Sequence, residues 1–168
     1  DQNRGLGNER LLPEGYLREP KSRLNGSTVI EHTKVAQTQR NMHLEIGQPY
    51  LLNASLDLNR FDSSQCFNAV VGIGFPQRFY QTLNQLKVNQ YQAHEFPDHH
   101  DYQISDITFN NQNAIITTEK DAVKFKVLLK QHPEFNIPIW VVPVEAVLSS
   151  DCYALLKQQL QHVGIQFS

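Results

Sequence analysis

The chain is poor in cysteine, in net charge and in long apolar runs, and each scarcity excludes a class of protein. Its two cysteines, Cys66 and Cys152, lie far apart in apolar settings. We interpret them as reduced core thiols of a cytoplasmic protein, with a disulfide as the alternative. No apolar run approaches the roughly 20 residues that a helix needs to cross a bilayer, and no secretory signal is visible. The formal net charge of −2 argues against a general nucleic-acid binder.

Methionine is almost absent as well, since Met42 is the only one among the 168 residues. The chain begins at Asp1, directly in a turn-rich loop, and we therefore expect further residues upstream. With 40% apolar and 19% charged residues, the composition is that of an ordinary soluble globular protein. The length is sufficient for one well-buried domain, or for one and a fraction.

The first part of the chain predicts an ordered loop followed by a small β region. Residues 1–25 are rich in glycine, proline, arginine and asparagine, which favour turns over regular structure. A short strand is predicted at 27–31, and the alternation of apolar and polar residues at 42–46 is typical of a half-buried strand. A turn at 47–49 then makes 50–52 a candidate hairpin partner.

From residue 61 onward, strands and helices alternate, which predicts a C-terminal α/β domain at 61–168 after a separate region at 1–60. Such alternation favours parallel βαβ units with right-handed crossovers and helices on the faces of the sheet. Ser149 or Ser150 is a suitable cap for the last helix. The predicted strands are 67–71, 90–94, 114–117 and 137–142, and the predicted helices are 77–86, 119–130 and one that begins at about 150.

The segment 72–76, Gly-Ile-Gly-Phe-Pro, lies between a predicted strand and a predicted helix. Two glycines let a backbone approach an anion at a helix N-terminus, but they also simply form a sharp turn. The third glycine of a dinucleotide fingerprint is absent, because Phe79 or Tyr80 stands near its place. Arg78 faces a ligand, a neighbouring domain or solvent, so this segment alone does not identify a function.

Two charged segments each have a structural and a functional interpretation. Thr118 and Asp121 resemble a capping box at the start of a helix, but this charged turn would also suit the ligand-binding edge of an open α/β sheet. Arg18 and Glu19, beside Pro20, form either a surface ion pair or a phosphate-binding pair in which the acid orients the guanidinium. The residues alone leave both alternatives open.

The cluster Asp98-His99-His100-Asp101 contains the side chains best suited to proton transfer or metal binding. Histidine titrates near neutral pH, and a neighbouring carboxylate can fix its tautomer and raise its basicity. His99 or His100 is therefore a candidate for proton transfer. The two histidines with Asp98 or Asp101 are a candidate metal site, and a structural histidine at the end of a strand is the third interpretation.

The motifs gain weight when they are taken together and in order along the chain. They occupy residues 4–8, 11–13, 17–20, 72–74 with 76–79, 96–100, 117–124 and 140–144. Each is weak evidence by itself, whereas the whole series in this order is specific. The series closely resembles the tetraacyldisaccharide 4′-kinase family of lipid A biosynthesis, and it covers only the C-terminal half of that family.

The resemblance implies a P-loop kinase, a transferase that moves the γ-phosphoryl of ATP, with Mg²⁺, to the 4′-hydroxyl of a lipid-linked tetraacyldisaccharide 1-phosphate, a lipopolysaccharide precursor. This chain contains no G-x-x-x-x-G-K-[ST] motif. It also lacks the family's acidic Walker B pair and the upstream aspartate that acts as the catalytic base. A missing N-terminal half would bind most of the nucleotide and the metal. That half would also seat the enzyme on the cytoplasmic face of the bacterial inner membrane. We expect a monomer with no nucleic-acid partner, and an inactive fragment.

Carried over residue by residue, the resemblance assigns Arg18 and Glu19 to the nucleotide and phosphate side of the active site, with Arg18 also catalytic. It assigns Asp98 and His99 to the segment whose histidine pairs with the catalytic aspartate. His100 is the second candidate for that role. The resemblance implies no metal ligand among the residues of this chain.

Two alternatives come from other classes of protein. Asp98-His99-His100 reproduces the three-residue signature of the DHH metal-dependent phosphoesterases, which also need aspartates in apolar strands upstream. Asp57 and Asp62 lie in a polar stretch, which argues against this alternative. The other is a non-catalytic α/β module that docks on the missing kinase half, and it is compatible with the kinase interpretation.

Overall fold

The structure consists of two compact units, which are described separately. It is a computed structural model, and it describes residues 5–32, 41–53 and 60–165. The first unit contains residues 1–45 and 145–168, and the second contains residues 46–144. These bounds differ from the predicted division at residue 60, because the last strand and the last helix group with the N-terminal segment rather than with the larger sheet.

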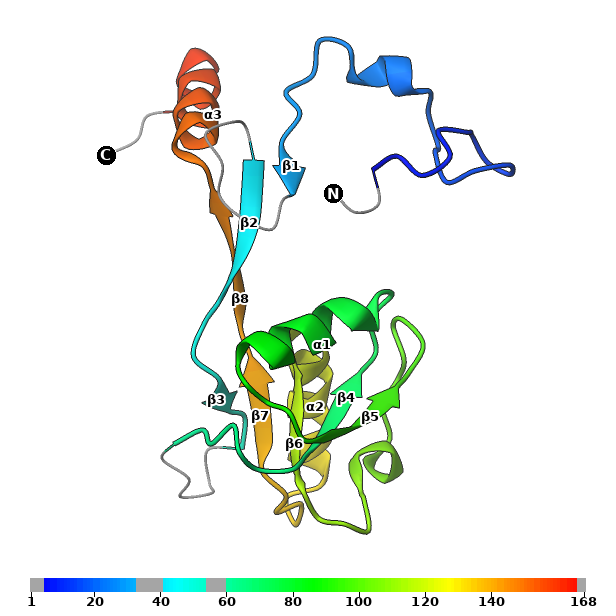
Figure 1. The fold of residues 1–168 in the computed structure, drawn as a ribbon, viewed down its shortest axis with the longest axis vertical. Coiled ribbons are helices and arrows are strands. Elements are labelled where there is room, and N and C mark those ends of the chain that lie inside the picture. Colours follow the sequence, from blue (N-terminus) through cyan, green and yellow to red (C-terminus); the bar gives the residue numbers. More distant parts are fainter. Residues whose placement is uncertain (1–4, 33–40, 54–59, 166–168) are drawn as a thin grey trace. The chain divides into compact units, whose positions relative to one another are not determined.

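The second unit contains a five-stranded sheet (Figure 1). From one edge to the other, its strands are β3 (Tyr50–Leu51), β7 (Ile139–Val142), β6 (Ala114–Thr118), β4 (Phe67–Val71) and β5 (Tyr91–Glu95). The four longer strands are parallel, whereas β3 is antiparallel to β7. The predicted α/β class with parallel βαβ units is confirmed.

Helices cover both faces of this sheet, so the second unit has three layers. Helix α1 (Pro76–Gln85) begins at a proline, whose missing N–H would have no partner in the first turn, and it buries Phe79. Helix α2 (Glu119–Gln131) buries Phe125 in a separate core cluster. Figure 1 shows α1 in front of the sheet and α2 behind it.

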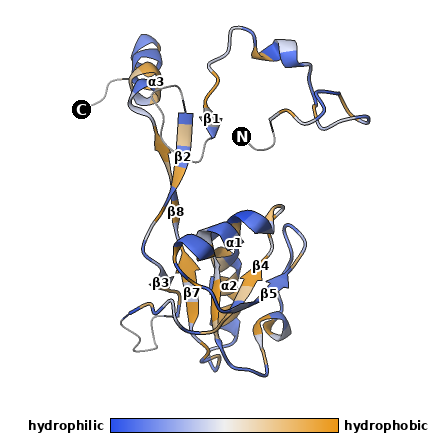
Figure 2. Ribbon diagram, in the orientation of Figure 1, coloured by the Kyte–Doolittle hydropathy of each residue, from blue (hydrophilic) through white to orange (hydrophobic). Residues whose placement is uncertain are grey.

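Strand β4 lies at the centre of the core because both of its faces are covered. Every one of its residues is buried, and Asn68 is its only polar residue. Val71 and Ile116 belong to the cluster on the α1 side, whereas Val70 and Ile115 belong to the cluster on the α2 side. Figure 2 shows the hydrophobic colour along β4, β6 and β7, as expected for parallel strands that are buried on both faces.

The first unit combines an irregular N-terminal segment with a small sheet and one helix. Its elements are the 3₁₀ turn η1 (Lys21–Leu24), strands β1 (Glu31–His32), β2 (Asn41–Ile46) and β8 (Val144–Leu148), and helix α3 (Ser150–His162). Strand β2 lies between β1 and β8. Of the two predicted candidates, Ser149 caps α3, because its hydroxyl accepts a hydrogen bond from the Cys152 N–H at 3.3 Å. Among the described helices, none is both long and apolar enough to cross a membrane.

The predicted hairpin between 42–46 and 50–52 is wrong. Strand β3 pairs with β7, with Tyr50 opposite Val141, and β2 pairs with β1 and β8. The chain leaves β2 through Gly47, whose N–H donates to the carbonyl of Pro143 at 3.0 Å, so it runs on beside the β7–β8 connection instead of turning back.

The two cysteines are both free, but only one of them is a core thiol. Cys152 is buried in α3, whereas Cys66 is exposed just before β4. The Cys66 thiol donates to the side-chain oxygen of Gln90 at 2.9 Å. The prediction of two buried thiols is therefore wrong for Cys66, because the apolar run that buries β4 begins one residue later.

Asp121, in the first turn of α2, is a fully buried carboxylate that accepts three hydrogen bonds. One of its oxygens accepts from the N–H of Gly72 at 3.1 Å and from the hydroxyl of Thr118 at 2.9 Å, and the other accepts from the hydroxyl of Tyr102 at 3.2 Å. Burial, and then the charge of Asp121, raise the pKa of Tyr102, so its hydroxyl keeps the proton that it donates. This carboxylate thus joins segments that follow β4, β5 and β6.

Replacement of this carboxylate should destabilise the fold. We expect Asp121→Ala to lower the free energy of unfolding by about 2–4 kcal/mol, because the buried N–H of Gly72 loses its acceptor and two further hydrogen bonds are lost. Asp121→Asn should cost less, on the order of 1 kcal/mol, because its remaining oxygen can still accept. Urea denaturation measures both changes. Asp101→Ala, which removes an exposed carboxylate, is the control, and equal stability of Asp121→Ala and this control would contradict the expectation.

Candidate functional site

The predicted histidine cluster lies at the edge of the larger sheet where β4, β5 and β6 all end. Because these strands are parallel, their carboxyl ends share one edge, from which the loops 72–75 and 96–103 depart beside the start of α2. Strand β4 connects through α1 to β5 on one side, while β6 lies on its other side. Ligands of open α/β sheets bind at such a reversal of strand order. The topology therefore makes this edge the candidate site of the second unit.

Two glycines bring the loop after β4 close to its neighbours. A Cβ atom on Gly72 would lie 2.6 Å from the hydroxyl of Tyr102, a separation that no side chain could tolerate without movement. A Cβ atom on Gly74 would lie 3.6 Å from a carboxylate oxygen of Asp98. The close approach at Gly72 accounts for a glycine there, and it supports the interpretation of 72–76 as a sharp turn packed against the histidine segment.

His99 occupies an exposed and strained position at this edge. The N–H of His100 donates to the carbonyl of Pro97 at 3.0 Å, which closes a tight turn with Asp98 and His99 at its centre. His99 has a φ of 64°, in the left-handed region that is uncommon for residues other than glycine, although asparagine, aspartate and histidine adopt it more often than other side chains. Its side chain is 80% exposed. The turn therefore holds this imidazole out from the sheet edge.

Asp98 bonds to a lysine rather than to either histidine ring. One of its carboxylate oxygens accepts from the ammonium of Lys120 and from the N–H of His99, the latter at 3.1 Å. The other oxygen lies 3.7 Å from Nε2 of His99, which is too long for a hydrogen bond. The bond from Lys120 is the largest cause that holds the pKa of Asp98 below its usual value. The carboxylate is therefore charged at neutral pH.

His100 is packed and paired, unlike His99. Its Nε2 lies 2.9 Å from Oδ2 of Asp106, and its ring stacks on Phe96 with the centroids 4.6 Å apart. The ring also meets Tyr102 edge-on at 4.9 Å. Lys124 donates to the backbone carbonyl of His100 at 2.6 Å. These contacts favour a structural role for His100, which anchors one end of the turn.

The cluster is not arranged as a metal site. Within residues 5–32, 41–53 and 60–165, no group of three or more His, Cys, Asp or Glu could hold a metal ion. Asp98 is bound to Lys120, and His100 is turned toward Asp106. These residues therefore do not fit Mg²⁺, and the alternative of a DHH phosphoesterase finds no support in their geometry.

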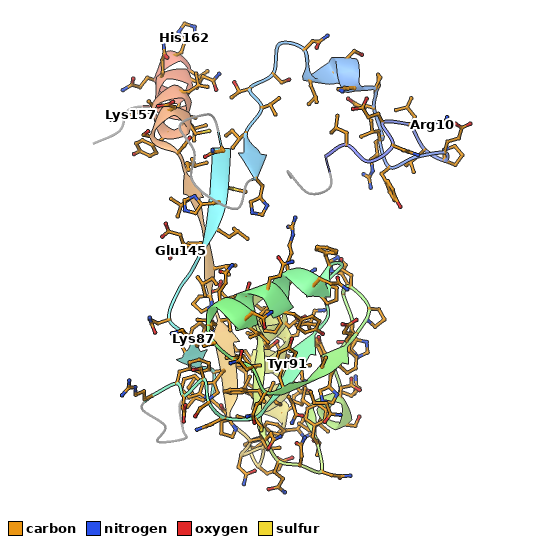
Figure 3. The ribbon with its side chains drawn as sticks, in the orientation of Figure 1. Arg10, Lys87, Tyr91, Glu145, Lys157 and His162 are labelled. Carbon is orange, nitrogen blue, oxygen red and sulfur yellow. The ribbon has the colours of Figure 1, made fainter. Side chains whose placement is uncertain are left out.

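The other predicted pair, Arg18 and Glu19, lies on the N-terminal loop of the first unit. Both side chains are exposed. The carboxylate of Glu19, which was expected to orient Arg18, pairs instead with Nε of Arg23 at 2.8 Å. Arg23 follows Glu19 by four residues, and the turn η1 brings the two side chains onto the same side. Figure 3 shows Arg10 on the same loop. Arg18 and His99 belong to different units, and their participation in one site stays a prediction.

Lys120 and Lys124 lie in the motif 117–124, but the sequence did not predict that these lysines, or Asp106, contact the histidine turn. A partial signal exists, because the cap at Thr118 starts α2 and the spacing of four residues then puts both lysines on one side of the helix. Their partners, however, precede them by 22 and 24 residues along the chain. Only the packing of α2 against the sheet reveals these contacts.

Comparison with known proteins confirms the resemblance. The family model of tetraacyldisaccharide-1-P 4′-kinase matches residues 1–161. The chain is 36% identical to the tetraacyldisaccharide 4′-kinase of Psychrobacter arcticus, in an alignment that covers 100% of this chain and 54% of that protein. It is 39% identical to the tetraacyldisaccharide 4′-kinase of Halorhodospira halophila, over 86% of this chain and 42% of that protein.

A solved structure has the same fold. The crystal structure of LpxK from Aquifex aeolicus in complex with ATP superposes with a TM-score of 0.57 at 23% identity, over 94% of this chain and 49% of that chain. This chain spans about half the length of the curated relatives that it matches. From the family match and the identity to these relatives, we conclude that the chain belongs to the tetraacyldisaccharide-1-P 4′-kinase family.

Proposed function

We propose that this chain is the C-terminal part of an ATP-dependent lipid kinase that phosphorylates the 4′-hydroxyl of a tetraacyldisaccharide 1-phosphate in lipid A biosynthesis. Membership of the family supports the reaction class. The observation in this chain that carries the proposal is His99, exposed at the ligand-binding edge of the sheet on an anchored turn. The phosphate-binding loop, absent from this sequence, would come from the rest of the full-length protein.

His99 is suited to move a proton. In the proposed mechanism it forms a dyad with an aspartate outside this chain. The dyad accepts the proton of the sugar hydroxyl as that oxygen attacks the γ-phosphorus of ATP, whose bond to the bridging oxygen breaks and releases ADP. General bases act within hydrogen-bond reach of the proton that they remove, and the 80% exposure of His99 leaves its ring accessible to such a partner. His100 is the weaker candidate because its ring is already paired with Asp106.

Arg18 would act on charge rather than on the proton. Phosphoryl transfer spreads negative charge over the equatorial oxygens of the transferred group, and catalysis rests mainly on positioning and charge neutralisation. An exposed arginine on a loop stiffened by Pro20 can approach phosphate oxygens with its planar fork. Glu19 would assist at the nucleotide side, although in this structure its carboxylate pairs with Arg23.

We assign the binding of magnesium and the attachment to the membrane to the rest of the enzyme. The residues described here do not form a cation site, so we assign Mg²⁺ to the N-terminal part of the full-length protein together with most of the ATP contacts. We likewise assign to that part the peripheral attachment to the cytoplasmic face of the bacterial inner membrane. The enzyme is proposed to act as a monomer on a lipid-linked disaccharide, and no nucleic acid is involved.

Substitution of His99 separates catalysis from stability. In the full-length protein, we expect His99→Ala to lower kcat by roughly 10²–10⁴-fold with little change in the KM for ATP, because proton transfer contributes to rate and not to ATP binding. His99→Gly should be as inactive as His99→Ala. Its free energy of unfolding should nevertheless be about 1 kcal/mol higher than that of His99→Ala, because glycine adopts a left-handed φ without strain. Steady-state kinetics and urea denaturation measure the two effects. Near-normal turnover by either variant would remove His99 from the mechanism.

A second set of variants tests Arg18. Arg18→Ala should lower turnover by about 10²–10³-fold, as does the loss of other preorganised contacts to transition-state charge. Arg18→Lys should restore part of this loss, because lysine supplies the charge without the bidentate fork. The matched control is Arg10→Ala, which removes an exposed arginine of the same loop that pairs with Glu14 at 3.0 Å. If Arg18→Ala and Arg10→Ala are equally active, Arg18 is an ordinary surface residue.

The chain by itself should transfer no phosphate. It contains no P-loop, whose backbone amides and lysine hold the β- and γ-phosphates in kinases of this class. Incubation of residues 1–168 with Mg-ATP and the acceptor lipid, followed by separation of the lipid products, measures this directly. Reproducible formation of the 4′-phosphate would refute the assignment of nucleotide binding to the rest of the protein.

A further inference from the structure

Two lysines of α2 contact the residues immediately before and after His99. We propose that Lys120 and Lys124 are positioning residues, which form a clamp on residues 97–100 and thereby present His99 in its strained conformation. The inference rests on the proposed function of His99, and it extends that function to residues that touch neither substrate nor ATP.

The two contacts fix the residues on either side of His99. The ammonium of Lys120 bonds to the carboxylate of Asp98, the residue before His99, and this same carboxylate oxygen accepts from the N–H of His99 at 3.1 Å. The ammonium of Lys124 bonds at 2.6 Å to the carbonyl of His100, the residue after His99. His99 itself is thus free to point outward while both of its neighbours are fixed.

The turn needs such support because its centre is strained and solvated. A residue that carries a Cβ atom is strained at a φ of 64°. Because the ring of His99 is 80% exposed, it makes little packing contact that could offset this strain. The alternative is a relaxed backbone at position 99, which would aim the imidazole elsewhere. Displacement of a catalytic group by about 1 Å can already cost about 100-fold in rate.

Helix α2 is a rigid base for the clamp. Each lysine immediately precedes a fully buried residue, Lys120 before Asp121 and Lys124 before Phe125, so the backbone under both lysines is fixed in the core. The ammonium of Lys124 also lies 5.6 Å from the centre of the Tyr102 ring, which limits its freedom. The spacing of four residues puts the two lysines one helical turn apart, where one reaches Asp98 and the other reaches His100.

A double substitution in the full-length protein tests the clamp. Lys120→Met with Lys124→Met keeps most of the length of both side chains and removes both charges. We expect kcat to fall by at least about tenfold while the KM for ATP stays within twofold, because a misplaced general base slows the chemical step and not binding. Lys120→Arg with Lys124→Arg should recover much of the rate. Lys126→Met, which removes an exposed charge from the same helix, is the control and should leave kcat unchanged.

The readouts separate this proposal from its premise and from a merely structural role. The thermal unfolding midpoint of the double variant should remain close to that of the wild type, so a loss of kcat explained by unfolding would overturn the clamp. If His99→Ala is inactive but the double lysine variant keeps its kcat, the clamp is wrong and the function of His99 stands. If the KM for ATP rises while kcat is unchanged, the lysines bind substrate instead and the clamp is wrong. If His99→Ala is fully active, the proposed function of His99 fails, and the clamp fails with it.

Discussion

The buried carboxylate of Asp121 holds together the segments on which the candidate site depends. It accepts hydrogen bonds from Gly72, Tyr102 and Thr118, which follow or end three neighbouring parallel strands. A charge in the core is stable only when its oxygens are satisfied, so this residue ties the loop geometry to the integrity of the fold. The close approach at Gly72 and the edge-on packing of Tyr102 against His100 are consequences of the same arrangement.

Side chains become more exposed with distance from this buried carboxylate. His100 is stacked and paired one layer further out, and Asp98 is held by a lysine at the surface. His99 comes last, with a left-handed backbone and an exposed ring. A residue in such a conformation lowers stability, and it persists only where its surroundings specify it. The gradient from a satisfied core to a strained surface residue is what one expects where a reactive group must meet a partner from another part of a protein.

Much of the second unit follows from local sequence. The segments 67–71 and 114–118, rich in apolar and β-branched residues, are long enough for buried strands and too short for helices. Pro76 and Thr118 start helices for reasons that are visible in a few residues, namely a missing donor and a capping hydroxyl. The order of motifs along the chain was sufficient to name the family. By contrast, the partner of β3 could not be predicted, because two residues of strand carry no signal for which edge they will join.

The sequence by itself determined the α/β class, the position of the strands and helices of the larger sheet, and the residues that could carry chemistry. Only the tertiary structure decided which of the two adjacent histidines is exposed. It also decided that Lys120 and Lys124 contact the turn at 97–100. The reason is the range of the interactions. Capping and hydrophobic periodicity depend on a few neighbouring residues, whereas the contacts of the two lysines with the turn join residues 22 and 24 positions apart. Those contacts exist only because parallel strands bring their carboxyl ends to a single edge.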